Sequence, residues 1–255
     1  MKIKTITVIN QKGGVGKSTT VLSIGAGLIL QGHKVLYVDL DAQCNLTYTI
    51  GASAKINPCN IFDVLQNPNR IHEGIQSTKN GDIIAGTIEL SGADMLITQT
   101  GKEYRLREAL EKISNQYDYC VIDTPPALGI LTINALTASD GAIIPAQADI
   151  YSLHGINQLS NTIHAVQKYC NHGLKIMGIV ITRFNKRSII RKEIAELLEE
   201  TAKQLNTQVY KTKIRECTAL VESQATQQNI YEYAKKSNAA QDYKELVKEI
   251  LADEN

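Results

Sequence analysis

A glycine-rich stretch near the N-terminus constrains this chain more than any other feature. Residues 10–19 read N-Q-K-G-G-V-G-K-S-T, after the apolar run Ile6–Ile9 and before a helix-like segment, Ser18–Gln31. A strand, a glycine-rich loop and a helix in this order make a phosphate-binding loop. The glycines let backbone N–H groups turn toward phosphates, and the helix start adds its positive dipole end. The stretch therefore predicts a nucleotide site.

Eight consecutive loop residues are expected to contact the nucleotide: Lys12, Gly13, Gly14, Val15, Gly16, Lys17, Ser18 and Thr19. Lys17 can reach the β- and γ-phosphates, and the Ser18 hydroxyl can ligate Mg²⁺. Gln11 stands where the usual loop has glycine, and Lys12 adds a second lysine. This lysine is poorly placed for its own nucleotide and could serve a phosphate held by a second subunit. A glycine-rich turn that merely carries lysines is the alternative, which the flanking strand and helix disfavour.

Carboxylates follow two further apolar runs. Asp39 and Asp41 lie one residue apart in V-D-L-D-A-Q, and Asp123 ends Y-C-V-I-D. Near a phosphate loop, Asp39 and Asp123 are expected to serve Mg²⁺, and Asp41 to orient the water that attacks the γ-phosphate. Catalysis is thus assigned to Lys12, Lys17 and Asp41. Taken alone, Asp39 and Asp41 are equally typical of a turn or helix cap, and a strand that ends in aspartate, as at Asp123, is a frequent pattern.

The order of segments predicts an α/β fold, a doubly wound and mostly parallel sheet with helices on both faces. The expected strands are short, continuous and β-branched, as strands covered on both faces should be: Thr5–Asn10, Val35–Asp39, Tyr119–Asp123, Ala142–Pro145 and Ile176–Thr182. The expected helices are Ser18–Gln31, Glu103–Asn115, Ser152–Tyr169, Arg191–Gln204 and Ala239–Leu251. The region from Ala52 to Gly101 is the hardest to interpret, with turn signals and a weak strand at Ile83–Ile84.

Composition places limits on the chain as a whole. Its 255 residues, 43% apolar, show no linker or repeat, so residues 1–255 are expected to form a single P-loop domain. Five scattered cysteines favour reduced thiols in a cytoplasmic protein over disulfides or a zinc site. No signal peptide or membrane-spanning run is expected. A formal charge of +1 means that any contact with DNA needs a local patch.

A basic cluster after the last expected strand is the candidate patch. It comprises Arg183, Lys186, Arg187, Arg191 and Lys192. Such clusters bind phosphates, and the first four are the expected DNA contacts. A solvated loop and helix start is the alternative. The segment after Thr182 is also where the adenine is expected to lie.

With these pieces assembled, the chain resembles the ParA/Soj family of DNA-partitioning ATPases, within the deviant Walker A group that includes MinD. The matching segments are Lys12–Thr19, Val38–Asn45, Val121–Leu136, Ile144–Gly155 and Ile230–Tyr243. The resemblance implies an ATP- and Mg²⁺-dependent homodimer in which Lys12 crosses to the partner's nucleotide. It also implies non-specific binding to DNA of the nucleoid and hydrolysis accelerated by a ParB-type centromere-binding partner.

Two departures accompany the resemblance. Ala42 replaces a frequent proline, and Ala219 stands where a second DNA-contacting arginine would fall, so Lys211, Lys213 and Arg215 are the candidates to replace that arginine. A MinD-like ATPase at a membrane or cell pole is the main alternative. The C-terminal segment 243–255 ends acidic, whereas membrane-surface helices are basic, so no membrane partner is expected. A dethiobiotin- or cobyrinate-type ligase is a third alternative. An iron–sulfur reductase also shares the loop, but its cluster-bridging cysteines have no match in this chain.

Overall fold

One mixed sheet organises the chain in the computed structural model, which describes residues 3–185 and 189–253. Among these residues the sheet has seven strands in the order β3-β4-β2-β5-β1-β6-β7. Only β3 runs antiparallel, against β4, so the predicted α/β fold with a mostly parallel sheet is confirmed. The strands are β1 Lys4–Val8, β2 Val35–Asp39, β3 Ile75–Thr78, β4 Gly81–Ile84, β5 Tyr119–Asp123, β6 Gly141–Gln147 and β7 Lys175–Thr182.

The strands read as continuous apolar runs because both faces of the sheet are covered. In β2 all five residues are buried. Tyr37 packs into the core on one face, whereas Leu36 and Val38 pack into the core on the other. Successive side chains of a strand point to opposite faces, so a strand between two helical layers needs apolar residues at every position.

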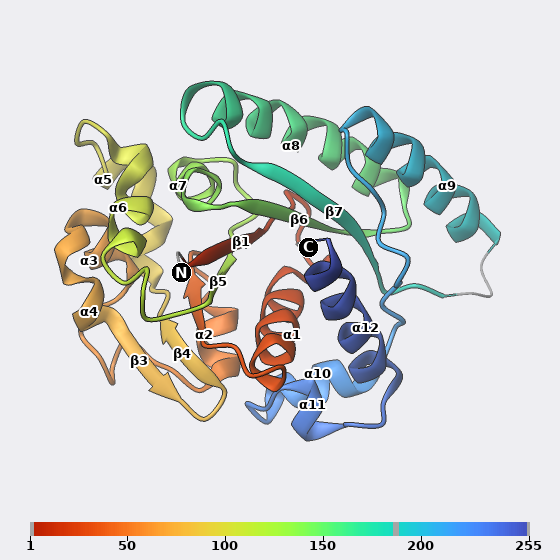
Figure 1. Ribbon diagram of the computed structural model, residues 1–255, viewed down its shortest axis with the longest axis horizontal. Coiled ribbons are helices and arrows are strands. Elements are labelled where there is room, and N and C mark those ends of the chain that lie inside the picture. The colour runs from red at the N-terminus through yellow and green to blue at the C-terminus, as the bar shows by residue number, and fades with distance from the viewer. Residues whose placement is uncertain (1–2, 186–188, 254–255) are drawn as a thin grey trace.

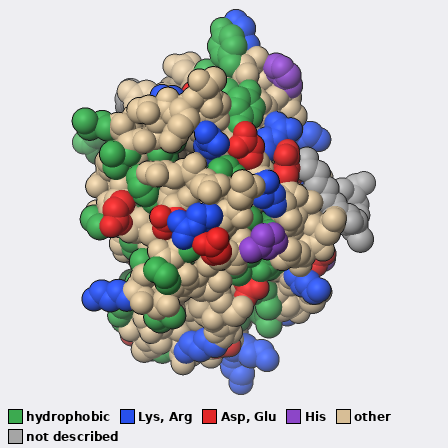
Figure 2. Space-filling view, turned by 90° about the vertical axis from the view of Figure 1, so that its left-hand side faces the viewer, with side chains coloured by type: hydrophobic (Ala, Val, Ile, Leu, Met, Phe, Trp, Pro, Cys, Tyr) green, Lys and Arg blue, Asp and Glu red, His purple; other side chains and the backbone are tan. Residues whose placement is uncertain are grey.

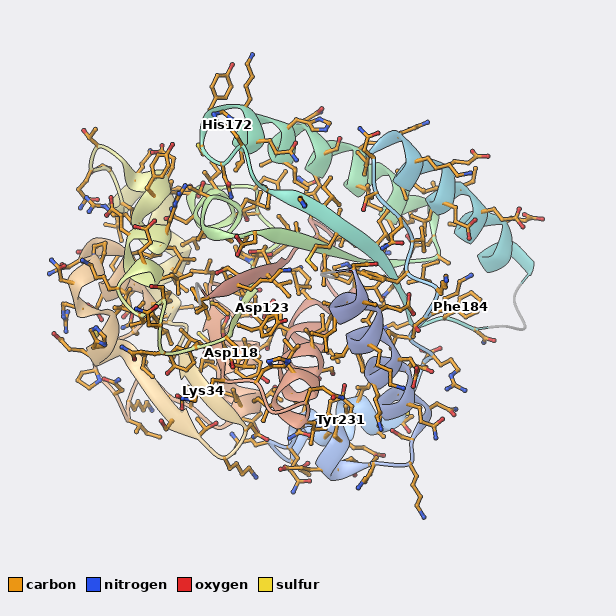
Figure 3. The ribbon with its side chains drawn as sticks, in the orientation of Figure 1. Lys34, Asp118, Asp123, His172, Phe184 and Tyr231 are labelled. Atoms are coloured by element: carbon orange, nitrogen blue, oxygen red, sulfur yellow. The ribbon has the colours of Figure 1, made fainter. Side chains whose placement is uncertain are left out.

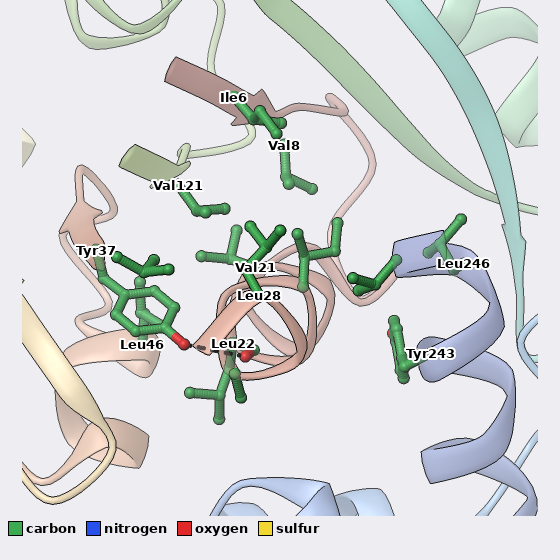
Figure 4. Close-up of a cluster of buried hydrophobic side chains, with 14 of the residues drawn as sticks. Ile6, Val8, Val21, Leu22, Leu28, Tyr37, Leu46, Val121, Tyr243 and Leu246 are labelled. Carbon is green, nitrogen blue, oxygen red and sulfur yellow. Dashed lines mark hydrogen bonds between the residues drawn. The ribbon is translucent and has the colours of Figure 1, made fainter. Parts of the chain in front are cut away.

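The helices of one face surround α1, which follows β1 directly (Figure 1). Figure 4 shows Val21, Leu22 and Leu28 of α1 among side chains from β1, β2, β5 and α12. Tyr37 donates from its hydroxyl to the Leu22 carbonyl at 3.3 Å. The helices of this face are α1 Lys17–Leu30, α2 Asn45–Ile50, α10 Thr218–Ala225, α11 Ile230–Tyr233 and α12 Asn238–Ala252.

Helices on the other face and at the β3 end complete the layers (Figure 1). They are α3 Ile61–Gln66, α4 Ile71–Gly74, α5 Ala93–Leu96, α6 Arg105–Glu111, α7 Ile130–Ala138, α8 Ile150–Tyr169 and α9 Ile189–Gln204, with short 3₁₀ turns at Pro68–Arg70, Ile88–Gly92 and Lys102–Tyr104. The single helix expected over Glu103–Asn115 is wrong in extent, because a 3₁₀ turn precedes α6 and the helix ends at Glu111.

The surface seen from the β3 end carries both signs of charge. Figure 2 shows Lys and Arg side chains interspersed with Asp and Glu on this face, with hydrophobic side chains scattered between them. Mixed charges cancel within roughly a Debye length of about 8–10 Å, so this face presents no extended field of one sign. In the described part of the chain, none of the helices combines the length and the apolar character that crossing a bilayer requires.

Strand register places the predicted acidic residues together. β5 lies between β1 and β2, and its last residue, Asp123, is the register partner of Asp39 in β2 and of Val8 in β1. The phosphate loop leaves the sheet just beyond Val8. The carboxyl ends of adjacent parallel strands therefore bring the loop and two carboxyl groups to one site, as expected for this class of sheet.

Candidate functional site

The phosphate loop has the backbone conformation that its glycines permit. Gly14 and Gly16 have φ of 74° and 90°, which strains residues with a Cβ. Open space lies beside Gly13, Gly14 and Gly16, with no atom within 4 Å of an added Cβ. The loop is held from outside by Thr182, whose hydroxyl donates to the Val15 carbonyl at 2.8 Å. The chain is thus shaped to receive a ligand against its backbone.

A pocket of about 520 Å³ opens over this loop. Its lining includes Gly13, Gly14, Gly16, Lys17, Ser18, Thr19 and Asp41. Lys17 is only 8% exposed, and its Nζ donates to the Lys12 carbonyl at 3.3 Å. Burial lowers the pKa of Lys17, although Asp123 and Asp41 favour its charged form. A negatively charged phosphate that enters the pocket would therefore stabilise the charged form of this mostly buried lysine.

Asp39 and Asp123 differ in the hydrogen bonds that their carboxyl groups accept. Asp39 Oδ2 accepts from both the backbone N–H and the hydroxyl of Thr47, at 2.8 and 2.7 Å, and Oδ1 accepts from the Asp41 N–H at 3.1 Å. Burial raises the pKa of Asp39 to about 6, against these hydrogen bonds. Asp39 therefore organises the segment that carries Asp41 and Thr47, while its role toward a metal remains a prediction.

Asp123 is fully buried, yet neither of its oxygens completes a hydrogen bond of ordinary geometry among the described residues. Burial and then the nearby Asp39 raise its pKa well above the usual value, while Ser18 and Lys17 favour the charged form. Figure 3 places Asp123 near the centre of the molecule. An orphaned carboxyl group beside a serine hydroxyl fits a bound cation, because Mg²⁺ prefers oxygen ligands.

Asp41 occupies the pocket wall. Its Oδ1 accepts from the Gln43 N–H at 3.0 Å, and its side chain is 9% exposed. The same turn therefore satisfies one oxygen and leaves the carboxylate bordering the pocket, opposite the loop glycines. This position suits the predicted water-orienting role.

Lys12 turns away from the pocket and is absent from its lining. Its Nζ donates to Asp149 at short range and to Gln147 Oε1 at 3.4 Å, and lies 6.0 Å from the centre of the Tyr151 ring. Although burial opposes it, the hydrogen bond from Lys12, with that from the Ser152 N–H, lowers the pKa of Asp149. The two lysines of the loop thus have separate surroundings, and the role of Lys12 between subunits stays a prediction.

A second recess of about 280 Å³ borders the loop. Thr182 and Arg183 line it, at the segment expected to lie near the adenine, but its far wall comes from residues 214–221 and Gln224. Gln224 donates to the Thr19 hydroxyl at 2.6 Å and borders both recesses. No motif marked Gln224, because its contact with the loop spans 205 residues of sequence and depends on α10 folding back.

The chain matches known proteins along almost its whole length. A family model described as an AAA domain matches residues 3–176. The sporulation initiation inhibitor protein Soj of Bacillus subtilis is 41% identical over 254 residues, 98% of this chain and 99% of Soj. The chromosome partitioning protein ParA of Myxococcus xanthus is 35% identical, with 97% and 88% covered. This chain belongs to the ParA/Soj family of P-loop ATPases.

Solved structures agree with this fold. Cobyrinic acid a,c-diamide synthase from Mycobacterium smegmatis, with a bound ATP analogue and magnesium, is 33% identical with a TM-score of 0.84, over 98% of this chain and 94% of that one. A plasmid partition protein from Borrelia burgdorferi is 27% identical with a TM-score of 0.73, over 96% and 98%. The resemblance drawn from the motifs is confirmed.

The structure describes only some of the four residues that are expected to contact DNA. Arg183 lines both recesses and has a φ of 48°, a strained conformation outside glycine. Arg183 therefore borders the nucleotide pocket, and its expected contact with DNA stays a prediction. Lys186 and Arg187 lie outside the described residues, and so does the side chain of Arg191 in α9.

Two of the three candidates for the second DNA contact, Lys213 and Arg215, have side chains that already contact other residues. Arg215 pairs with Asp242 through Nε and Nη2, at 2.6 to 3.1 Å. Lys213 lies 4.9 Å from the centre of the Phe184 ring, beyond the end of β7 (Figure 3). An arginine held by a two-point ion pair is a poor candidate for a further phosphate.

Proposed function

We propose that this protein is an ATP-switched DNA-partitioning ATPase. The observation that carries the proposal is the separation of the two loop lysines, with Lys17 inside the nucleotide pocket and Lys12 outside it. A loop that served only its own nucleotide would have no use for a second cation directed elsewhere. Sequence identity to Soj and ParA along the full chain supports the same function.

Within one subunit, the loop amides and Lys17 bind the phosphates of ATP. Ser18, Asp123 and Asp39 would hold Mg²⁺, which when bound would offset the negative charge of the phosphates. Asp41 accepts a hydrogen bond from the attacking water and directs it at the γ-phosphorus. Arg183 and Gln224 border the nucleoside side and position it.

Between subunits, Lys12 leaves Asp149 and contacts the triphosphate of the partner, so the homodimer forms with ATP and dissociates after hydrolysis. Dimerisation also doubles each cationic contact with DNA, which suits a chain whose formal charge is only +1. Lys186, Arg187 and Arg191 supply those contacts without reading sequence, while Arg183 serves the nucleotide. A ParB-type protein at a centromere-like site accelerates hydrolysis and releases the dimer from the nucleoid in the cytoplasm.

A mobility-shift assay with non-specific duplex DNA at low salt tests the proposal. The shift should need ATP and Mg²⁺, disappear with Lys17→Ala because nucleotide is not bound, and disappear with Lys12→Ala although nucleotide still binds. A normal ATP-dependent shift by Lys12→Ala would contradict the role of this lysine between subunits.

Two other outcomes would redirect the assignment. ATP-dependent sedimentation with anionic liposomes, without a DNA shift, would favour a MinD-like role. ATP turnover that requires a small carboxylic acid would favour a ligase, the activity class suggested by the similarity to cobyrinic acid a,c-diamide synthase.

A further inference from the structure

A large cavity lies at the opposite end of α1 from the phosphate loop. Its volume is about 690 Å³, and it is enclosed by the C-terminal end of α1, the turn between β3 and β4, α11 and α12. This volume falls in the range of roughly 300–1,000 Å³ typical of small-molecule sites. It shares no lining residue with either recess at the loop, so the nucleotide site does not account for it.

The floor of this cavity is apolar and closely packed. Gly27 of α1 faces α11 and α12, where an added Cβ would lie 2.8 Å from Val247 Cγ2 and 2.9 Å from the Tyr231 hydroxyl oxygen. Tyr231 lies at the lower edge of the molecule in Figure 3. Leu30 and Ile29 also line the cavity and are 65% and 36% exposed. Aliphatic surface is therefore left in contact with water, where an apolar ligand would cover it.

The rim of the cavity is cationic. Lys79, Lys235 and Lys244 come from three separate segments and converge on it, against one acidic residue, Glu232. Within the described residues none of these lysines lies within 4 Å of a carboxylate in an ion pair. Three lysines and one glutamate leave an excess of two positive charges over the apolar floor.

The wall of the cavity is held in place by side-chain amides. Asn80 Nδ2 lies 3.2 Å from both the Ile50 and the Gln227 carbonyl oxygens, and Asn229 donates to Asn80 Oδ1 at 3.2 Å. Asn80 and Asn229 are both buried and both line the cavity. A site with a fixed wall loses little conformational entropy when a ligand binds.

We propose that this cavity binds a small amphipathic anion, with an apolar body against Leu30, Tyr231 and Val247 and one anionic head group at the lysine rim. A carboxylate, sulfonate or phosphate would satisfy the rim equally. Binding at this site is a property of the chain beyond its proposed partitioning function, because it requires neither nucleotide nor DNA.

Isothermal titration with decanoate, below the concentration at which it forms micelles, tests the inference. The full chain is first saturated with ADP and Mg²⁺, so that the probe cannot enter the nucleotide pocket. Decanoate should bind saturably with one site per chain, and decyltrimethylammonium should bind at least about tenfold more weakly, since the rim repels a cation.

Lys244→Glu should weaken decanoate about tenfold, whereas Lys112→Glu, an exposed lysine on the opposite helical layer, should leave it unchanged. Leu30→Asp, an exposed substitution that spares the core, should weaken it as well. Equal binding of the anion and the cation, or insensitivity to Lys244→Glu, would overturn the inference.

Discussion

The ion pair between Lys12 and Asp149 offers the sharpest test of the proposed dimer. In the described structure Lys12 is committed to Asp149, so it must leave this carboxylate before it can reach a partner's nucleotide. Asp149→Asn removes the charge. It keeps the N-cap of α8, where Oδ1 accepts from the Ser152 N–H at 2.9 Å, because Asn caps helices as well as Asp. The substitution therefore isolates the electrostatic restraint on Lys12.

The expected change in the dimerisation constant follows from how exposed the Lys12–Asp149 ion pair is. The two side chains are 26% and 32% exposed, so the pair contributes near the upper end of the surface range, about 1 kcal/mol. That energy corresponds to roughly fivefold in an equilibrium constant. A symmetric dimer must break two such pairs, which together contribute about 2 kcal/mol. Asp149→Asn should therefore tighten ATP-dependent dimerisation by roughly 30-fold.

Sedimentation equilibrium with a non-hydrolysable ATP analogue and Mg²⁺ measures this constant. Asp118→Asn is the matched control, because Asp118 precedes β5, at the opposite end of that strand from Asp123, and its carboxylate accepts from the Lys34 N–H (Figure 3). The double variant Lys12→Ala/Asp149→Asn should lose the gain. An unchanged or weaker dimer for Asp149→Asn, with the same melting temperature as the parent, would refute the reasoning.

Three further predictions concern the pocket itself. Asp41→Ala should bind ATP but hydrolyse it at least about 100-fold more slowly, leaving a persistent dimer on DNA in mobility shifts; unchanged turnover would exclude Asp41 as the water-orienting group. Because burial raises the pKa of Asp123, the nucleotide-free folded state retains a proton that the unfolded chain releases. Its free energy of unfolding should thus fall as the pH rises from about 4 through the higher folded pKa. Denaturant titrations of Asp123→Asn should show a shallower pH dependence, and an identical slope would contradict this origin. Gln224→Ala should weaken nucleotide binding about fivefold by loss of one hydrogen bond of about 1 kcal/mol, measured with a fluorescent ADP analogue, while Gln227→Ala serves as the control from the same segment.

Much of the central fold was predictable because local pattern and tertiary environment agree there. β2 and β5 have the bounds that were predicted, Val35–Asp39 and Tyr119–Asp123, since every residue in them is apolar or a terminal aspartate and both faces are covered. The region from Ala52 to Gly101 was not predictable. It folds into short helices and the β3–β4 hairpin, whose elements of four to six residues carry too few turns for a clear period.

The same division runs through the site. Motif spacing located the loop and three aspartates, because the carboxyl ends of β2 and β5 are fixed by strand pairing. It did not distinguish Asp39 from Asp123, since both end buried strands. The difference arises from Thr47, eight residues beyond Asp39, whose N–H and hydroxyl reach back to that carboxyl alone.

This asymmetry explains how two carboxyl groups can share one buried site. Two unpaired carboxylates at adjacent strand ends would repel, and burial already disfavours the charge on each. Hydrogen bonds from Thr47 and Asp41 stabilise charge on Asp39 within the protein, so the demand for an external cation concentrates on Asp123. Removing the Thr47 hydroxyl by Thr47→Val would withdraw one of those bonds and raise the pKa of Asp39 further. A bound cation would thus offset the free-energy cost of burying the Asp123 carboxyl group. The stability of this end of the sheet is therefore coupled to occupation of the nucleotide site.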